Sequence, residues 1–99
     1  MITAEQKTAW IEALRSGKYK QGTCSLSCSA DTYCCLGVYA KINNMFSDNG
    51  CEVGNSQFYL PEDVMPKEYQ RTLSGKNDAG ESFNTIADFI EQADIENYR

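Results

Sequence analysis

Apolar residues recur at spacings of three and four positions near the C-terminus, as they do on the buried face of a helix. The residues of this face are Phe83, Ile86, Ala87 and Ile90. Ser82 comes directly before them and can cap the first helical turn through its hydroxyl. The pattern predicts an amphipathic helix over residues 82–94, with one stripe facing a core.

A second helix is predicted over residues 3–16. Thr3 and Gln6 have the spacing of a capping box, and Gly17 follows at the usual stop position. Its inward-facing residues are Trp10, Ala13 and Leu14.

A third helix is predicted from about residue 31 to residue 46. Its apolar face consists of Cys35, Val38, Tyr39, Ile42, Met45 and Phe46. Gly37 lies inside this helix, where glycine costs about 1 kcal/mol relative to alanine. We therefore expect another backbone to pack closely against Gly37 in a buried contact.

The segments between these helices are less periodic. Residues 18–30 are polar and rich in serine, with Leu26 as their large aliphatic anchor, so they form either a loop or a short irregular hairpin. After a turn at residues 47–50, the best strand candidate is Gln-Phe-Tyr-Leu at residues 57–60.

Pro66 can start a further helix that runs through Leu73 and is closed by Gly75. Residues 1–99 contain no repeat and no linker long enough to divide them. The pattern predicts a compact single domain of the α+β class, mostly α, with three to four helices and a short β hairpin or edge element. We expect it to fold on its own, and a homo-oligomer remains open.

Charge is distributed unevenly along the chain. The net charge is -5, with five basic and three acidic side chains in residues 1–45 but four basic and eleven acidic ones in residues 46–99. Such a chain is a poor general binder of nucleic acid, which requires a clustered cationic surface. The N-terminus lacks the features of a secretory signal, and no run of eighteen apolar residues occurs, so we expect a cytoplasmic protein without a membrane partner.

The side chains that could catalyse a reaction are few. The chain has no histidine, which excludes Cys-His and Ser-His nucleophilic schemes within it. Five cysteines, at positions 24, 28, 34, 35 and 51, allow a zinc site only with a Cys-only or Cys-plus-carboxylate shell. We favour small, buried, reduced residues for Cys34 and Cys35. The sequence therefore predicts a non-enzymatic protein without a metal or cofactor.

Two groups of residues are candidates for ligand binding. Asn77, Asp78 and Ser82 place amide, carboxylate and hydroxyl groups before the free N–H groups of a helix N-terminus, although turn formation and capping explain the same residues. The second group could stack a nucleobase and hold its phosphate, although solvated lysines and tyrosines at the rim of the core are the alternative. Its members are Arg15, Lys18, Tyr19, Gln21, Tyr33 and Tyr39.

Three blocks of the sequence support a family resemblance. They are WIEALRSGKYKQG at 10–22, DTYCCLGV at 31–38 and NDxGxSFxxIAxxI at 77–90. Together they resemble a family of short, largely uncharacterised proteins encoded by tailed bacteriophages and prophages. The resemblance implies host takeover or evasion of host defence in the host cytoplasm, and it implies no catalytic residues.

We therefore expect a phage-type accessory protein that binds and sequesters a small anionic ligand, such as a nucleotide immune signal. The expected ligand-binding residues are Arg15, Lys18, Tyr19, Gln21, Tyr33, Asn77, Asp78 and Ser82. One alternative is a protein that inhibits a host protein through its acidic C-terminal half. Another is a zinc-stabilised module based on cysteine.

Overall fold

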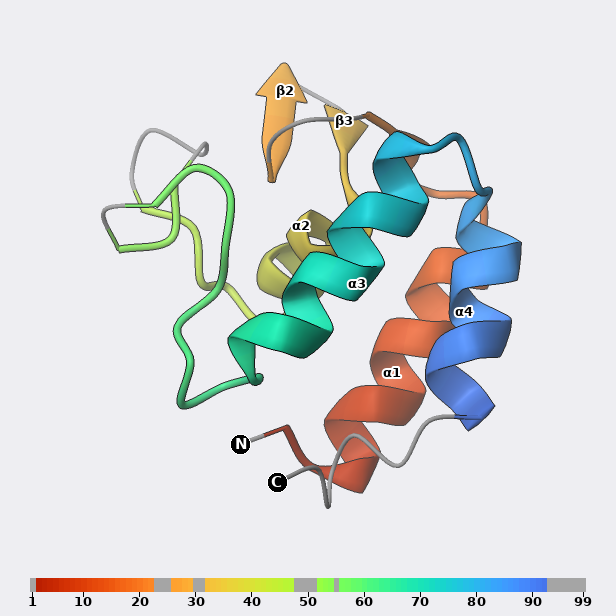
Figure 1. The fold of residues 1–99 in the computed structure, drawn as a ribbon, viewed down its shortest axis with the longest axis horizontal. Coiled ribbons are helices and arrows are strands. Elements are labelled where there is room, and N and C mark those ends of the chain that lie inside the picture. The colour runs from red at the N-terminus through yellow and green to blue at the C-terminus, as the bar shows by residue number, and fades with distance from the viewer. Residues whose placement is uncertain (1, 23–25, 30–31, 48–51, 55, 93–99) are drawn as a thin grey trace.

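The computed structural model describes residues 2–22, 26–29, 32–47, 52–54 and 56–92, with four helices and three short strands among them (Figure 1). The helices are α1 (Ala4–Arg15), α2 (Cys35–Ile42), α3 (Lys67–Asp78) and α4 (Phe83–Gln92). The strands are β1 (Lys20–Gln21), β2 (Ser27–Ser29) and β3 (Thr32–Tyr33). This arrangement confirms the predicted α+β fold that is mostly α.

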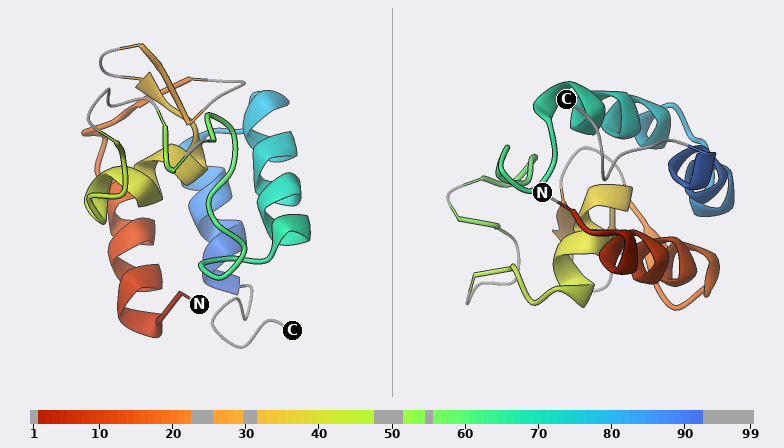
Figure 2. Two further views of the ribbon diagram at one scale, coloured as in Figure 1. Left: turned by 90° about the vertical axis from the view of Figure 1, so that its left-hand side faces the viewer. Right: turned by 90° about the horizontal axis from the view of Figure 1, so that it is seen from below.

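The helices pack around one core. α1 lies beside α4, while α2 contacts both α1 and α3 (Figures 1 and 2). The strands lie at the end of the helical group where α3 ends and α4 begins (Figure 1). None of the helices in the described residues has the length and apolar character that a membrane crossing requires.

The small sheet has the strand order β1-β3-β2. β1 runs parallel to β3, with Lys20 opposite Thr32 and Gln21 opposite Tyr33. β2 runs antiparallel to β3 with an irregular register. Residues 18–30 therefore do not form a hairpin of their own, because both of their strands pair with β3, a segment that the sequence assigned to a helix.

α1 begins and ends where the sequence predicts. The Gln6 backbone N–H donates to Thr3 Oγ1 (3.1 Å) and the Thr3 N–H donates to Gln6 Oε1 (3.0 Å), which confirms the capping box. Gly17 has a φ of 78°, which suits glycine at a helix stop. Trp10 is fully buried, and its indole N–H donates to the carbonyl of Cys35 (2.9 Å), which joins α1 to α2.

α2 is shorter than the predicted helix at both ends. It begins at Cys35 because the two residues before Cys34 belong to β3. It ends in a Schellman-type turn, in which the Met45 N–H donates to Ala40 O (2.9 Å) and Asn44 has a φ of 55°. Phe46 therefore lies outside the helix that the sequence predicts for it.

The backbone of Leu26 packs directly against Gly37, as the sequence predicts for this glycine. A Cβ atom at Gly37 would lie 1.9 Å from the carbonyl oxygen of Leu26. The same carbonyl accepts a hydrogen bond from the N–H of Cys34 (3.2 Å). The close neighbour is thus the residue before β2.

α3 begins after Pro66 as predicted but continues past Gly75 to Asp78. The expected stop at Gly75 is wrong, and the helix ends before Gly80, which has a φ of 92°. Asn77 is consequently helical rather than part of a loop. In α4, the predicted apolar face is buried, while residues 93 and 94 of the predicted helix lie outside the described residues.

The predicted strand at residues 57–60 is not formed. Ser56 Oγ accepts hydrogen bonds from the backbone N–H groups of Phe58 (3.3 Å) and Tyr59 (3.1 Å), which bends the chain. The backbone of Leu60 forms its hydrogen bonds with a side chain instead of a neighbouring strand. The fully buried Gln70 amide accepts from the Leu60 N–H (2.7 Å) and donates to the Leu60 carbonyl (2.9 Å).

Candidate functional site

The residues predicted to bind a ligand occupy several separate places in the fold. Arg15 lies on α1 against α4, and Gln21 meets Asn77 beside the sheet. Tyr19 and Tyr33 contact each other. Tyr39 lies elsewhere, because its ring packs edge-on against Trp10 at a centroid distance of 5.3 Å.

Arg15 forms ion pairs with two carboxylates of α4. Its guanidinium donates to Asp88 and to Glu91, the latter at 3.2 Å. The hydrogen bonds to Glu91 and then to Asp88 raise the pKa of Arg15. The charge of Arg15 is therefore paired at the contact between α1 and α4, and its role in ligand binding stays a prediction.

Asn77 is the centre of a buried polar junction. Its Oδ1 accepts from the backbone N–H of Cys35 (3.2 Å) and from Nε2 of Gln21 (2.9 Å). Its Nδ2 donates to the carbonyl of Gly22 (2.7 Å). Gln21 Nε2 also donates to Glu81 O (2.6 Å). We call these five residues the Asn77 junction.

The Asn77 junction connects the end of β1, the start of α2 and the end of α3. Asn77 is fully buried, so a ligand could reach its amide only if these elements separated. Removing one partner of a buried hydrogen bond costs about 1–3 kcal/mol. Asn77 is therefore a structural residue of this fold and the exposed Gln21 is one of its partners, while their binding of a ligand stays a prediction.

Ser82 caps α4. Its Oγ accepts the backbone N–H of Thr85 (3.2 Å) and lies 3.1 Å from the hydroxyl of that residue. Asp78 is an exposed helical residue, and a 3.8 Å ion pair between Lys76 and Glu81 spans the turn between α3 and α4. Capping and turn formation thus account for Ser82, as in the alternative interpretation of this segment.

A row of three half-buried aromatic rings lies beside the sheet. The Tyr19 and Tyr33 rings meet edge to face at 5.8 Å, and the Tyr33 and Phe46 rings lie 6.0 Å apart. We call these three residues the aromatic row. Phe46 was predicted to lie on the apolar face of a helix, although the Asn43-Asn44 pair before it was a signal for a helix end.

Two lysines adjoin Tyr19 of the aromatic row in the sequence. Lys18 and Lys20 are exposed neighbours of Tyr19 in the sequence, and Lys20 pairs in the sheet with Thr32, the residue before Tyr33. Among the described residues, no carboxylate forms an ion pair with Lys18 or Lys20. Lys18 and Lys20 therefore carry two positive charges close to Tyr19 in the sequence that no carboxylate of the described residues neutralises.

Cys34 and Cys35 are buried free thiols, as the sequence favours. The Cys35 thiol donates to the carbonyl of Leu73 (3.6 Å), and burial, followed by the neighbouring Cys34, raises its pKa well above the ordinary value. In the described part of the chain, no three metal-ligating side chains gather. Cys24 and Cys51 lie outside the described residues.

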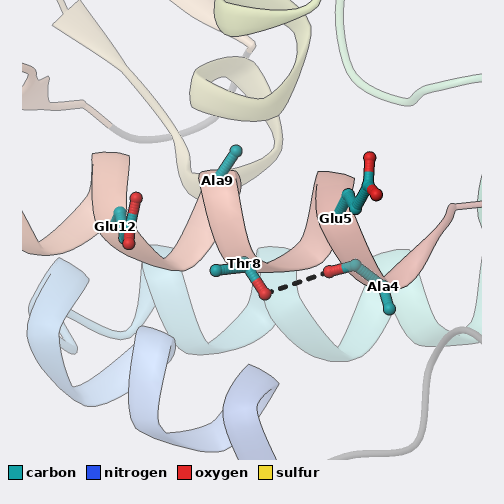
Figure 3. A pocket seen from close by; sticks show the side chains of 5 residues that line it. All are labelled: Ala4, Glu5, Thr8, Ala9 and Glu12. Carbon is teal, nitrogen blue, oxygen red and sulfur yellow. Dashed lines mark hydrogen bonds between the residues drawn. The ribbon is translucent and has the colours of Figure 1, made fainter.

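The outer face of α1 carries an open hollow of about 380 Å³ (Figure 3). Ala4, Glu5, Thr8, Ala9 and Glu12 line it. The Thr8 hydroxyl donates to the carbonyl of Ala4 (3.0 Å), so it is already engaged. Because a single helix supplies the whole lining, this hollow is a helix surface rather than an enclosed site.

Comparison with known families gives one match. A family model described as Domain of unknown function (DUF8296) matches residues 2–71, more than half of the chain. The chain belongs to this family. No curated protein and no solved structure matches it. The DUF8296 match contains Lys18, Lys20 and the aromatic row, and it ends inside α3 before Asn77.

Proposed function

We propose that this protein is a non-enzymatic binding protein that sequesters a small anionic ligand with a flat ring, of the nucleotide class. The ligand binds at the aromatic row, with Lys18 and Lys20 facing its phosphate. The observation that carries the proposal is the contact between the half-buried Tyr19 and Tyr33 rings. Lys18 and Lys20 adjoin Tyr19 in the sequence, are exposed and have no carboxylate partner among the described residues.

The two parts of this surface match the two parts of a nucleotide. Stacking of a base on an aromatic side chain contributes about 1–3 kcal/mol. A lysine ammonium attracts phosphate as a point charge, and two of them act together. The net charge of -5 repels a long polyanion, which favours a single nucleotide or a short cyclic one over nucleic acid.

The cellular setting remains a proposal from the sequence. The three blocks that resemble phage proteins support a role in the cytoplasm of an infected cell, where the protein would remove a nucleotide signal of host defence. The proposed binding residues differ from those expected from the sequence. Arg15 and the Asn77 junction form contacts within the fold, so we assign ligand binding to the aromatic row instead.

Isothermal titration calorimetry with cyclic and linear nucleotides tests this function. Separate titrations with nucleosides and with inorganic phosphate measure how much the base and the phosphate charge each contribute to the affinity. We expect Tyr33→Ala, and separately the double change Lys18→Glu with Lys20→Glu, to weaken nucleotide binding at least about tenfold.

Matched control variants are available on other surfaces. Lys41→Glu changes an exposed lysine on α2, and Tyr59→Ala removes a half-buried tyrosine that contacts Lys67 instead. Both should leave the affinity unchanged. Absence of binding by every nucleotide, or equal losses in the controls, would refute the proposal and direct the search to a host protein bound through the acidic C-terminal half.

A further inference from the structure

A polar hollow of about 350 Å³ forms where three segments meet, and it is separate from the aromatic row. α1 supplies one lining residue, the end of α2 supplies three, and the turn after Pro61 supplies two. They are Gln6, Tyr39, Asn43, Met45, Asp63 and Val64. The volume is at the lower end of the range for small-molecule sites, which is about 300–1,000 Å³.

Backbone hydrogen bonds hold these segments in place. The Ile2 N–H donates to the carbonyl of Val64 (2.9 Å), which fastens the start of the chain to the turn. The Val64 N–H donates to Pro61 O (3.0 Å), and the Schellman-type turn after α2 fixes Asn43 and Met45. Backbone hydrogen bonds therefore fix the segments that carry the lining residues.

Asn43 and Tyr39 offer acceptor atoms to the hollow. Asn43 uses its Nδ2 to donate to the carbonyl of Tyr39 (2.9 Å), which leaves its Oδ1 for another donor. The Tyr39 hydroxyl has a long hydrogen bond to Gln6 Oε1 (3.4 Å), and its oxygen can still accept. Burial raises the pKa of Tyr39, so this group stays neutral at ordinary pH.

The charge of the lining is negative. Asp63 is exposed and, among the described residues, forms no ion pair with a lysine or arginine. None of the described residues that line the hollow is cationic. The C-terminal end of α2 adds the negative end of a helix dipole, which favours a cation there.

We infer that this hollow binds a small organic cation with a primary ammonium group, of the class of short aliphatic amines and diamines. The ammonium donates to the Asp63 carboxylate and to Asn43 Oδ1. Met45 and Val64 contact the carbon chain. This site would be occupied independently of the aromatic row, because the two share no lining residue.

Titration with 1,4-diaminobutane at constant ionic strength, followed by NMR of the labelled full chain, tests the inference. We expect Asp63→Asn to weaken binding about two- to fivefold, because an exposed charge pair is lost. Tyr39→Phe, which keeps the ring and removes the hydroxyl, should weaken it severalfold.

Glu62→Gln is the matched control, because it removes the neighbouring exposed carboxylate, which lines a different hollow. It should leave the affinity for the diamine unchanged. Tetramethylammonium, a cation without N–H donors, should not compete. Equal losses in the Asp63 and Glu62 variants, competition by tetramethylammonium, or no binding of the diamine would overturn the inference.

Discussion

The aromatic row and the Asn77 junction differ in how completely the fold uses their polar groups. In the Asn77 junction, both ends of the Asn77 amide have partners inside the protein, and the residue is fully buried. Beside the aromatic row, the ammonium groups of Lys18 and Lys20 are exposed and have no carboxylate partner among the described residues. Both regions look suitable for a ligand in the sequence. The structural region differs from the candidate site because the polar groups of Asn77 are buried and hydrogen-bonded, whereas Lys18 and Lys20 are exposed.

The largest expected effect is on the structural side, at Gly37. Gly37→Ala forces a methyl group against the carbonyl of Leu26, where backbone must move, so we expect a loss of about 3 kcal/mol in the free energy of unfolding. Urea unfolding followed by circular dichroism measures it. Gly75→Ala is the control, because nothing lies within 4 Å of its added Cβ and alanine favours the helix by about 1 kcal/mol.

If Gly75→Ala were as destabilising as Gly37→Ala, the close approach of Leu26 would not be the cause. Failure of Gly37→Ala to fold, with a stable Gly75→Ala, would agree with the account.

Asn77→Ala should have the next largest effect. It leaves the Cys35 N–H and the Gly22 carbonyl without their partner, so we expect a loss of about 2–3 kcal/mol in the free energy of unfolding. Asn84→Ala, at an exposed position of α4, should change it by less than about 0.5 kcal/mol. A nearly neutral Asn77→Ala would return this residue to the list of ligand-binding candidates.

Arg15→Ala should have the smallest effect. Its ion pairs with Asp88 and Glu91 are exposed, so we expect a small decrease in the unfolding midpoint that disappears at high salt. Arg71→Ala, an exposed arginine on α3, should show no such salt dependence. Nucleotide affinity should be unchanged by Arg15→Ala, and a marked loss would place Arg15 back in the binding site.

Much of the helical fold could be predicted from the sequence because its signals are local. The capping box of Thr3 and Gln6 and the apolar face of α4 span a few residues each, and both are confirmed. Asn77 gave no such signal, because its partners lie 42 to 56 residues away in the sequence. The sequence also failed to predict β3, which lies between β1 and β2 in the sheet. A strand of two residues is too short to show an alternation of apolar and polar positions.

The candidate site was predicted in part. Lys18, Tyr19 and Tyr33 were named from the chemistry of their side chains, and the structure brings the two rings together. The ion pairs of Arg15 could not be predicted, because the sequence does not show that Asp88 and Glu91 face it across two packed helices. Phe46 was wrongly placed in a helix because the end of α2 at Ile42 depends on a backbone turn.

The most direct test is to identify the residues whose chemical shifts change when a nucleotide binds. Two-dimensional NMR of the labelled chain, titrated with the tightest-binding nucleotide, reports on each backbone amide. The account predicts shifts that cluster at residues 18–21, at Tyr33 and at Phe46, with residues 77–82 little changed. Shifts concentrated at residues 77–82 and the start of α4, with the aromatic row unaffected, would contradict it.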